Sequence, residues 1–127
     1  MKFWLCDHSW EDYKKTTSFV GFESKEEFSA LSLGDRIVYS GNGLVAGIFE
    51  AEGFAGNEYS GWQSSRPFQV RLKPLNIPQV DLVAKPLRYK VRLEKPFAGK
   101  GSLYRLSEQE YKKIELAILE GKKELVY

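Results

Sequence analysis

The fold is decided by a stretch in the first half of the chain, which has the sequence Arg36-Ile37-Val38-Tyr39-Ser40-Gly41-Asn42-Gly43-Leu44-Val45-Ala46-Gly47-Ile48-Phe49-Glu50-Ala51. Two apolar runs flank the turn formed by Gly41, Asn42 and Gly43. Asn and Gly tolerate the positive backbone φ angles that tight hairpin turns require. The stretch therefore predicts a β-hairpin, around which the remaining elements can be placed.

Other strands are predicted on both sides of this hairpin. The segment Lys2–Cys6 is largely apolar and indicates a buried first strand. Apolar and polar residues alternate in Phe68–Leu72 and in Leu87–Leu93. A period of two places each set of side chains on its own face of a sheet.

Helix starts are indicated where a Ser is followed three residues later by an acidic residue, a capping signature. This signature predicts helices at 9–15, near 25–31 and from Ser107 onward, with Gly121 ending the last one. Several strands with short marginal helices predict one α+β domain spanning residues 1–127. We expect an antiparallel or mixed, barrel-like sheet.

Composition excludes several classes of protein. Among 127 residues there are one His and one Cys, too few for a disulfide framework, a cysteine zinc site or a multi-histidine metal site. No apolar run is long enough for a signal peptide or for a membrane span, which needs ~20 apolar residues. We therefore expect no metal, no cofactor, no membrane partner and a cytoplasmic location.

Catalysis is the minority hypothesis. No phosphate loop or dinucleotide fingerprint is present. Asp7, His8 and Ser9 suggest a catalytic triad, but triads are assembled in space and rarely from sequence neighbours. A polar strand end followed by a helix cap explains them more simply. Cys6 lies in an apolar segment and is expected to be an inert core thiol, so we expect a binding module rather than an enzyme.

Charge is unevenly distributed along the chain. The net charge is only +2, yet residues 1–63 carry 5 basic and 10 acidic residues, and residues 64–127 carry 14 basic and 7 acidic ones. Several of the later cations lie on the non-core faces of the two alternating strands. If these strands share a sheet, the cations form a ridge suited to phosphates; a solvated outer face is the alternative. The candidate phosphate contacts are Arg71, Lys73, Arg88, Lys90, Arg92, Lys100 and Arg105.

Trp62 stands out among the aromatic residues. It lies in the polar segment 57–65, where no periodic pattern demands burial. A Trp in such a loop is either a plug over the core or a stacking platform for a base or a small ligand.

An ordered set of motifs resembles the EVE domain of the PUA-like superfamily, which is related to YTH domains. The motifs follow one another along nearly the whole chain: Lys2–Cys6, Leu33–Tyr39, Ala46–Glu50, Pro67–Leu75 and Gly101–Leu103. The resemblance implies a twisted, barrel-like fold with short helices and a nucleic-acid ligand whose modified base enters an aromatic-lined pocket. Some such domains are N-terminal modules of McrB-type modification-dependent restriction proteins, so a fused or assembling motor or nuclease is also implied.

The resemblance also implies a base pocket. Trp62 matches the aromatic residue of the loop that follows the Gly-Ile-Phe-Glu strand. One position departs from the family pattern, which has Trp where this chain has Val20, so the second wall of the pocket is either a Phe or missing. The polar end of the first strand and the hairpin tip complete the pocket. The full set is Trp62, Asp7, His8, Ser9, Phe19, Val20, Phe22, Tyr39 and Ser40.

The sequence thus favours a non-catalytic module that binds DNA and holds a flipped base, with or without a modification. An RNA-binding protein of the PUA-like type is one alternative. A small-molecule or protein-interaction adaptor is another, in which the pocket would exist but the basic strands would face away from it.

Overall fold

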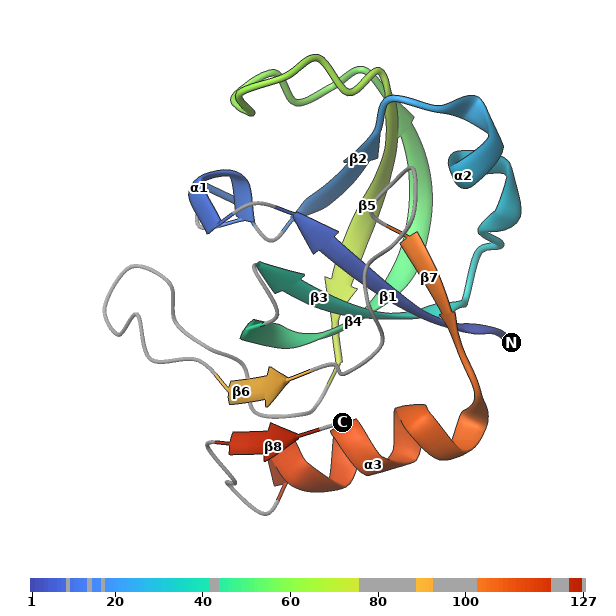
Figure 1. Cartoon of the computed structure of the whole chain (residues 1–127). Coiled ribbons are helices and arrows are strands. Elements are labelled where there is room, and N and C mark those ends of the chain that lie inside the picture. Colours follow the sequence, from blue (N-terminus) through green and yellow to red (C-terminus); the bar gives the residue numbers. More distant parts are fainter. Residues whose placement is uncertain are drawn as a thin grey trace.

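A computed structural model describes residues 1–8, 10–13, 15–16, 18–41, 44–75, 89–92, 103–119 and 124–126. Within these ranges a sheet is flanked by three helices (Figure 1). In chain order the elements are β1 (Phe3–His8), α1 (Trp10–Tyr13), β2 (Phe19–Phe22), α2 (Lys25–Ala30), β3 (Arg36–Gly41), β4 (Leu44–Gly56), β5 (Phe68–Pro74), β6 (Tyr89–Arg92), β7 (Leu103–Leu106), α3 (Glu108–Leu119) and β8 (Glu124–Val126).

The sheet is mixed, and its main path runs β2-β5-β4-β3-β1-β7. β1 is parallel to β3 and antiparallel to β7, whereas β3, β4, β5 and β2 pair antiparallel in succession. β6 pairs with β4 and with β8 away from this path. The α+β prediction is confirmed. Among the described strands no pairing joins β2 to β7, so closure into a barrel stays a prediction.

Local sequence signals located several elements correctly. The predicted hairpin is formed by β3 and β4, with Ile37 opposite Phe49; residues 42 and 43 of its turn lie outside the described residues. The capping box at the start of α3 is complete, because Ser107 N–H donates to Glu110 Oε1 at 3.0 Å and Glu110 N–H donates to Ser107 Oγ at 3.1 Å.

Short strands escaped the sequence analysis. β2, β7 and β8 each have four residues or fewer, too few for an alternation to be recognised. The described part of α1 is 10–13, with residue 15 in a turn, and that of β6 is 89–92; the other residues of these two predicted elements lie outside the described residues.

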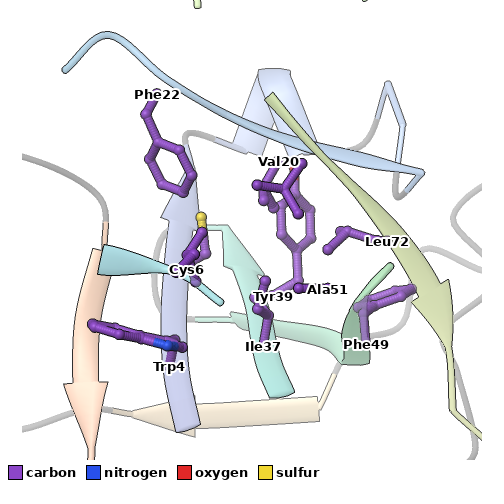
Figure 2. Close-up of a cluster of buried hydrophobic side chains, with 11 residues drawn as sticks. Trp4, Cys6, Val20, Phe22, Ile37, Tyr39, Phe49, Ala51 and Leu72 are labelled. Atoms are coloured by element: carbon purple, nitrogen blue, oxygen red, sulfur yellow. The ribbon is translucent and has the colours of Figure 1, made fainter. Parts of the chain in front are cut away.

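The central strands separate two apolar layers. One layer contains side chains from β1 to β5 that converge in Figure 2, among them Cys6, Val20, Phe22 and Tyr39. The other layer lies against α3 and contains Leu5, Val38, Ile48, Leu106, Tyr111 and Ile114. Alternation along β1 sends Cys6 to the first layer and Leu5 to the second, as period two requires.

Asp35 fixes the turn between α2 and β3. Its carboxylate is 1% exposed and accepts three hydrogen bonds of 2.9 Å, from the backbone N–H of Lys2, the indole N–H of Trp4 and the backbone N–H of Ser32. Gly34, one residue earlier, has a φ of 89°, a value that favours glycine. One side chain therefore connects the start of β1 to the end of α2.

No helix in the described part of the chain is long and apolar enough to cross a membrane.

Candidate functional site

The loop 57–67 connects β4 to β5 and extends above α1 at the top of Figure 1. It covers the face of β2 that points away from the core. Val20 and Phe22 belong to the core layer of Figure 2, so Phe19 and Gly21 face the loop. Tyr59 stacks on Phe19 with ring centroids 5.9 Å apart. The loop thus brings aromatic rings onto the outer face of the β2–β5 pair.

Gln69 in β5 holds this loop from below. Its side chain is fully buried and lies opposite Gly21 in the register of β2 and β5. The amide nitrogen donates to the carbonyl oxygens of Tyr59 and Arg66, and the amide oxygen accepts from Tyr59 N–H at 2.7 Å. Because the buried amide of Gln69 makes all three of these hydrogen bonds, it fixes the backbone near both ends of the loop, at Tyr59 and at Arg66.

Asp12 in α1 holds the same loop from the side. Its carboxylate is 2% exposed, accepts from Gln63 N–H at 2.8 Å and pairs with Arg66 Nη2 at 2.9 Å. Lys15 adds a bond from its ammonium to the carbonyl oxygen of Gly61 at 3.0 Å. Because breaking one partner of a buried ion pair leaves an uncompensated charge, Asp12 and Arg66 stabilise the position of the loop on α1 in the free protein.

Trp62 is buried beneath the loop, with 7% of its surface exposed. Its ring contacts Tyr59 and His8 edge to face, at centroid distances of 4.8 and 5.6 Å. The Arg66 guanidinium carbon lies 5.4 Å from the centre of the same ring. In this structure Trp62 is therefore a plug over the core and not an exposed stacking platform. The partly exposed aromatic ring of the loop is that of Tyr59.

His8 lies where the core meets the loop. It is 2% exposed; its Nε2 is 3.2 Å from the carbonyl oxygen of Gly21 and its Nδ1 is 2.9 Å from the hydroxyl of Tyr39. A carbonyl only accepts, so Nε2 carries the proton and Nδ1 accepts from the tyrosine. Burial, reinforced by the charge of Arg66, lowers the pKa of His8 to about 3 despite opposing contributions from Gly21 and Asp12. His8 is therefore neutral at physiological pH.

This neutral histidine predicts an acid-sensitive fold. The unfolded chain takes up the proton near the ordinary pKa of 6.5 and the folded chain only near 3, so stability is full above 6.5 and is lost as the pH falls between these values. The loss approaches about 1.4 kcal/mol per pH unit. Urea unfolding from about pH 7.5 to about pH 4.5 should show this slope, and a His8→Phe variant should lack it. Equal slopes in both proteins would contradict the assignment, since the chain has no other histidine.

The structure brings some of the sequence-predicted pocket residues together and separates others. His8, Phe19 and Trp62 line the contact between β1, β2 and the loop, and the hydroxyl of Tyr39 reaches it from the core. Val20 and Phe22 are core residues. Two other candidates, Asp7 and Ser40, bond to each other at 2.7 Å on the opposite face of β1 and β3 from His8. Ser9 lies outside the described residues.

The predicted basic ridge is divided. β5, which carries Arg71 and Lys73, pairs with β4 at Phe49–Gly56, whereas β6 pairs with β4 at Leu44 and Val45. The two alternating strands share a sheet but are not neighbours. Arg71 is exposed and forms an ion pair with Glu58 at 2.8 Å, and Lys73 is exposed.

The remaining predicted cations lie outside β5. Arg105 is exposed, with its guanidinium carbon 5.3 Å from the centre of the Trp4 ring. Lys90 and Arg92 belong to β6; Arg88 and Lys100 lie outside the described residues.

Residues that organise the site carried little signal in the sequence. The alternation in Phe68–Leu72 predicts only a polar outer face for Gln69, and the spacing from Ser9 to Asp12 predicts only a helix start. Their partners are 10 and 54 residues away along the chain, a separation that no local pattern reports. Among the described residues, no group of three or more His, Cys, Asp or Glu could hold a metal ion.

Comparison with known proteins defines the fold alone. No protein-family model matches the chain, and no curated protein matches it. Its structure is similar to the crystal structure of protein Atu2648 from Agrobacterium tumefaciens, with a TM-score of 0.50 and 15% sequence identity over 90% of each chain.

Proposed function

We propose that the chain is a non-catalytic nucleic-acid-binding module of the EVE type, with the twisted-barrel architecture of the PUA-like superfamily and DNA as its ligand. The observation that supports the proposal is the composition of the loop site. One loop carries two aromatic rings and an arginine onto the outer face of β2 and β5, next to the cations of β5. Aromatic surfaces beside positive charge are the common means of binding unpaired bases.

The energetics of such a site are consistent with a flipped base. Turning a base out of a duplex costs a few kcal/mol, and stacking on one aromatic ring returns roughly 1–3 kcal/mol. The half-exposed pair of Phe19 and Tyr59 offers the outer stacking surface, and Trp62 with His8 lies behind it. Phosphate contacts, with Lys73 of β5 as an exposed candidate, supply the remaining affinity and make it salt-dependent. A fused or assembling motor or nuclease is part of this proposal.

Titration of labelled duplexes by fluorescence anisotropy tests the proposal. We expect binding at low salt that weakens as the salt concentration rises, and a difference between methylated and unmethylated duplexes. Absence of binding to any nucleic acid at low salt would overturn the proposal. RNA of matched length that displaces the DNA completely would shift it to the RNA-binding alternative.

A matched pair of lysine variants locates the phosphate contact. Lys73→Gln should weaken binding equally for all sequences and reduce the slope of log affinity against log salt by about one. Lys112→Gln is the control, because Lys112 is also exposed but lies in α3 and pairs with Glu108 at 3.3 Å. Identical slopes for the two variants would exclude Lys73 as a contact.

A further inference from the structure

Two hydrogen-bond donors of the loop are buried without a partner among the described residues. They are the indole nitrogen Nε1 of Trp62 and the guanidinium nitrogen Nη1 of Arg66. Buried donors are almost always paired in folded proteins, and each exception calls for an explanation such as a water or a ligand. Here two exceptions occur four residues apart, in one loop and in side chains that stack on each other.

Both donors are held in fixed directions. A Cβ atom built on Gly21 would lie 2.7 Å from Cη2 of Trp62 and closer still to Cζ3, so that edge of the indole rests on β2. Nε1 is bonded to the ring carbon opposite Cζ3, so its N–H points away from β2. The hydrogen bond from Nη2 to Asp12 orients the Arg66 side chain. Nη1 is the other terminal nitrogen of the same rigid, planar guanidinium, so its direction is fixed as well.

The acceptors around these donors are already engaged. The two carboxylate oxygens of Asp12 accept from Gln63 and Arg66, the amide oxygen of Gln69 accepts from Tyr59, and Nδ1 of His8 accepts from Tyr39. The site thus has an excess of donors, one of them positively charged. Its chemical complement is a ligand oxygen that only accepts.

We propose that these two donors hold the oxo oxygen of the flipped base, so that the site takes bases bearing an oxo group and rejects adenine, which has none. The inference rests on the proposed function and adds the class of base to it. Because both atoms are covered in the free protein, the loop opens when the base enters. A phosphate oxygen is the other source of the same acceptor chemistry.

One matched pair of ligands tests the inference on the unmodified protein. Two oligonucleotides differ only in the base at one unpaired position, which is hypoxanthine in one and unsubstituted purine in the other. Hypoxanthine has an oxo oxygen on the ring carbon that carries only a hydrogen in unsubstituted purine. A third oligonucleotide has an abasic site there, and inorganic phosphate is added as a competitor. We expect hypoxanthine to bind at least about tenfold more tightly than purine, since hydrogen bonds that involve a charged group are the stronger ones.

Trp62→Phe keeps an aromatic ring but removes the N–H, and it should reduce the preference for hypoxanthine over purine. Trp4→Phe is the control, because the indole N–H of Trp4 is already bound to Asp35 outside the site. It should keep the preference.

The possible failures are distinguishable. Equal affinities for hypoxanthine and purine overturn the inference and leave DNA binding in place. Abasic DNA that binds as tightly as hypoxanthine, with phosphate competing, also overturns it, because the donors then hold a phosphate. If no oligonucleotide binds at low salt, the proposed function fails and the inference fails with it.

Discussion

Replacing Asp35 with Ala should lower the free energy of unfolding by at least about 3 kcal/mol. The substitution removes the acceptor of three N–H groups: the buried indole N–H of Trp4 and the partly buried backbone N–H groups of Lys2 and Ser32. Each buried donor without a partner costs about 1–3 kcal/mol. Urea denaturation followed by circular dichroism measures the loss.

The same carboxylate gives the stability a second dependence on pH. Burial raises the pKa of Asp35, but the hydrogen bonds from Lys2, Trp4 and Ser32 outweigh it and hold the pKa below its ordinary value of 3.8. A lowered pKa means that the stabilisation is complete above the unfolded-state value and is lost as the pH falls through the folded-state value. The advantage of the wild-type protein over Asp35→Asn should therefore shrink only below about pH 4, under the range in which His8 acts.

An exposed carboxylate provides the control for Asp35. Glu23→Ala removes a charge from the surface after β2 and should change the unfolding free energy by no more than about 0.5 kcal/mol. If Asp35→Ala were equally mild, the three hydrogen bonds would not contribute as described.

Gly21→Ala should displace the loop 57–67 from the sheet. The added Cβ would lie 2.7 Å from Cη2 of Trp62 and 2.9 Å from Cβ of Arg66. Neither atom is the free end of a flexible chain, since the indole is rigid and Arg66 is paired with Asp12. Overpacking of this kind costs about 1–3 kcal/mol. We expect that loss in urea denaturation, a red shift of tryptophan emission as Trp62 meets water, and loss of base binding.

Gly53→Ala is the matched control for Gly21→Ala. Among the described residues, a Cβ at Gly53 would meet only the tip of Arg71, at the ordinary contact distance of 3.8 Å. Stability, emission and binding should stay near their wild-type values. A second check is the variant Trp62→Leu, in which Gly21→Ala should cost less, because the two sites are in contact and their effects are coupled. Equal costs in both backgrounds would show that Trp62 is not what Gly21 accommodates.

Elements that depend on neighbouring residues could be predicted from the sequence. The hairpin of β3 and β4 follows from a turn with residues that tolerate positive φ, and the start of α3 follows from Ser107 and Glu110, which satisfy each other's backbone groups. In both cases the residues that decide the structure are close together in the chain. The alternation in β5 likewise gave the correct core face, with Val70 and Leu72 buried.

Features that depend on distant partners could not be predicted. The alternation that placed Val70 in the core also placed Gln69 on the outer face, but the fact that a loop covers that face is decided by Asp12 and Arg66, 54 residues apart. Burial of Trp62 has the same origin. The family resemblance places both Asp7 and His8 in the pocket, although adjacent residues of a strand send their side chains to opposite faces.

The position of β1 has a consequence for the order of folding. Among the described strands this one is synthesised first, yet it lies inside the sheet between β3 and β7, with Leu5 paired to both Val38 and Tyr104. Pairings with such long sequence separation close large loops and slow folding. On the ribosome, β1 can join β3 early, but its other edge stays open until residues near 104 have emerged. The nascent chain therefore presents an unpaired strand edge between the emergence of β3 and that of β7, a period in which it is prone to association.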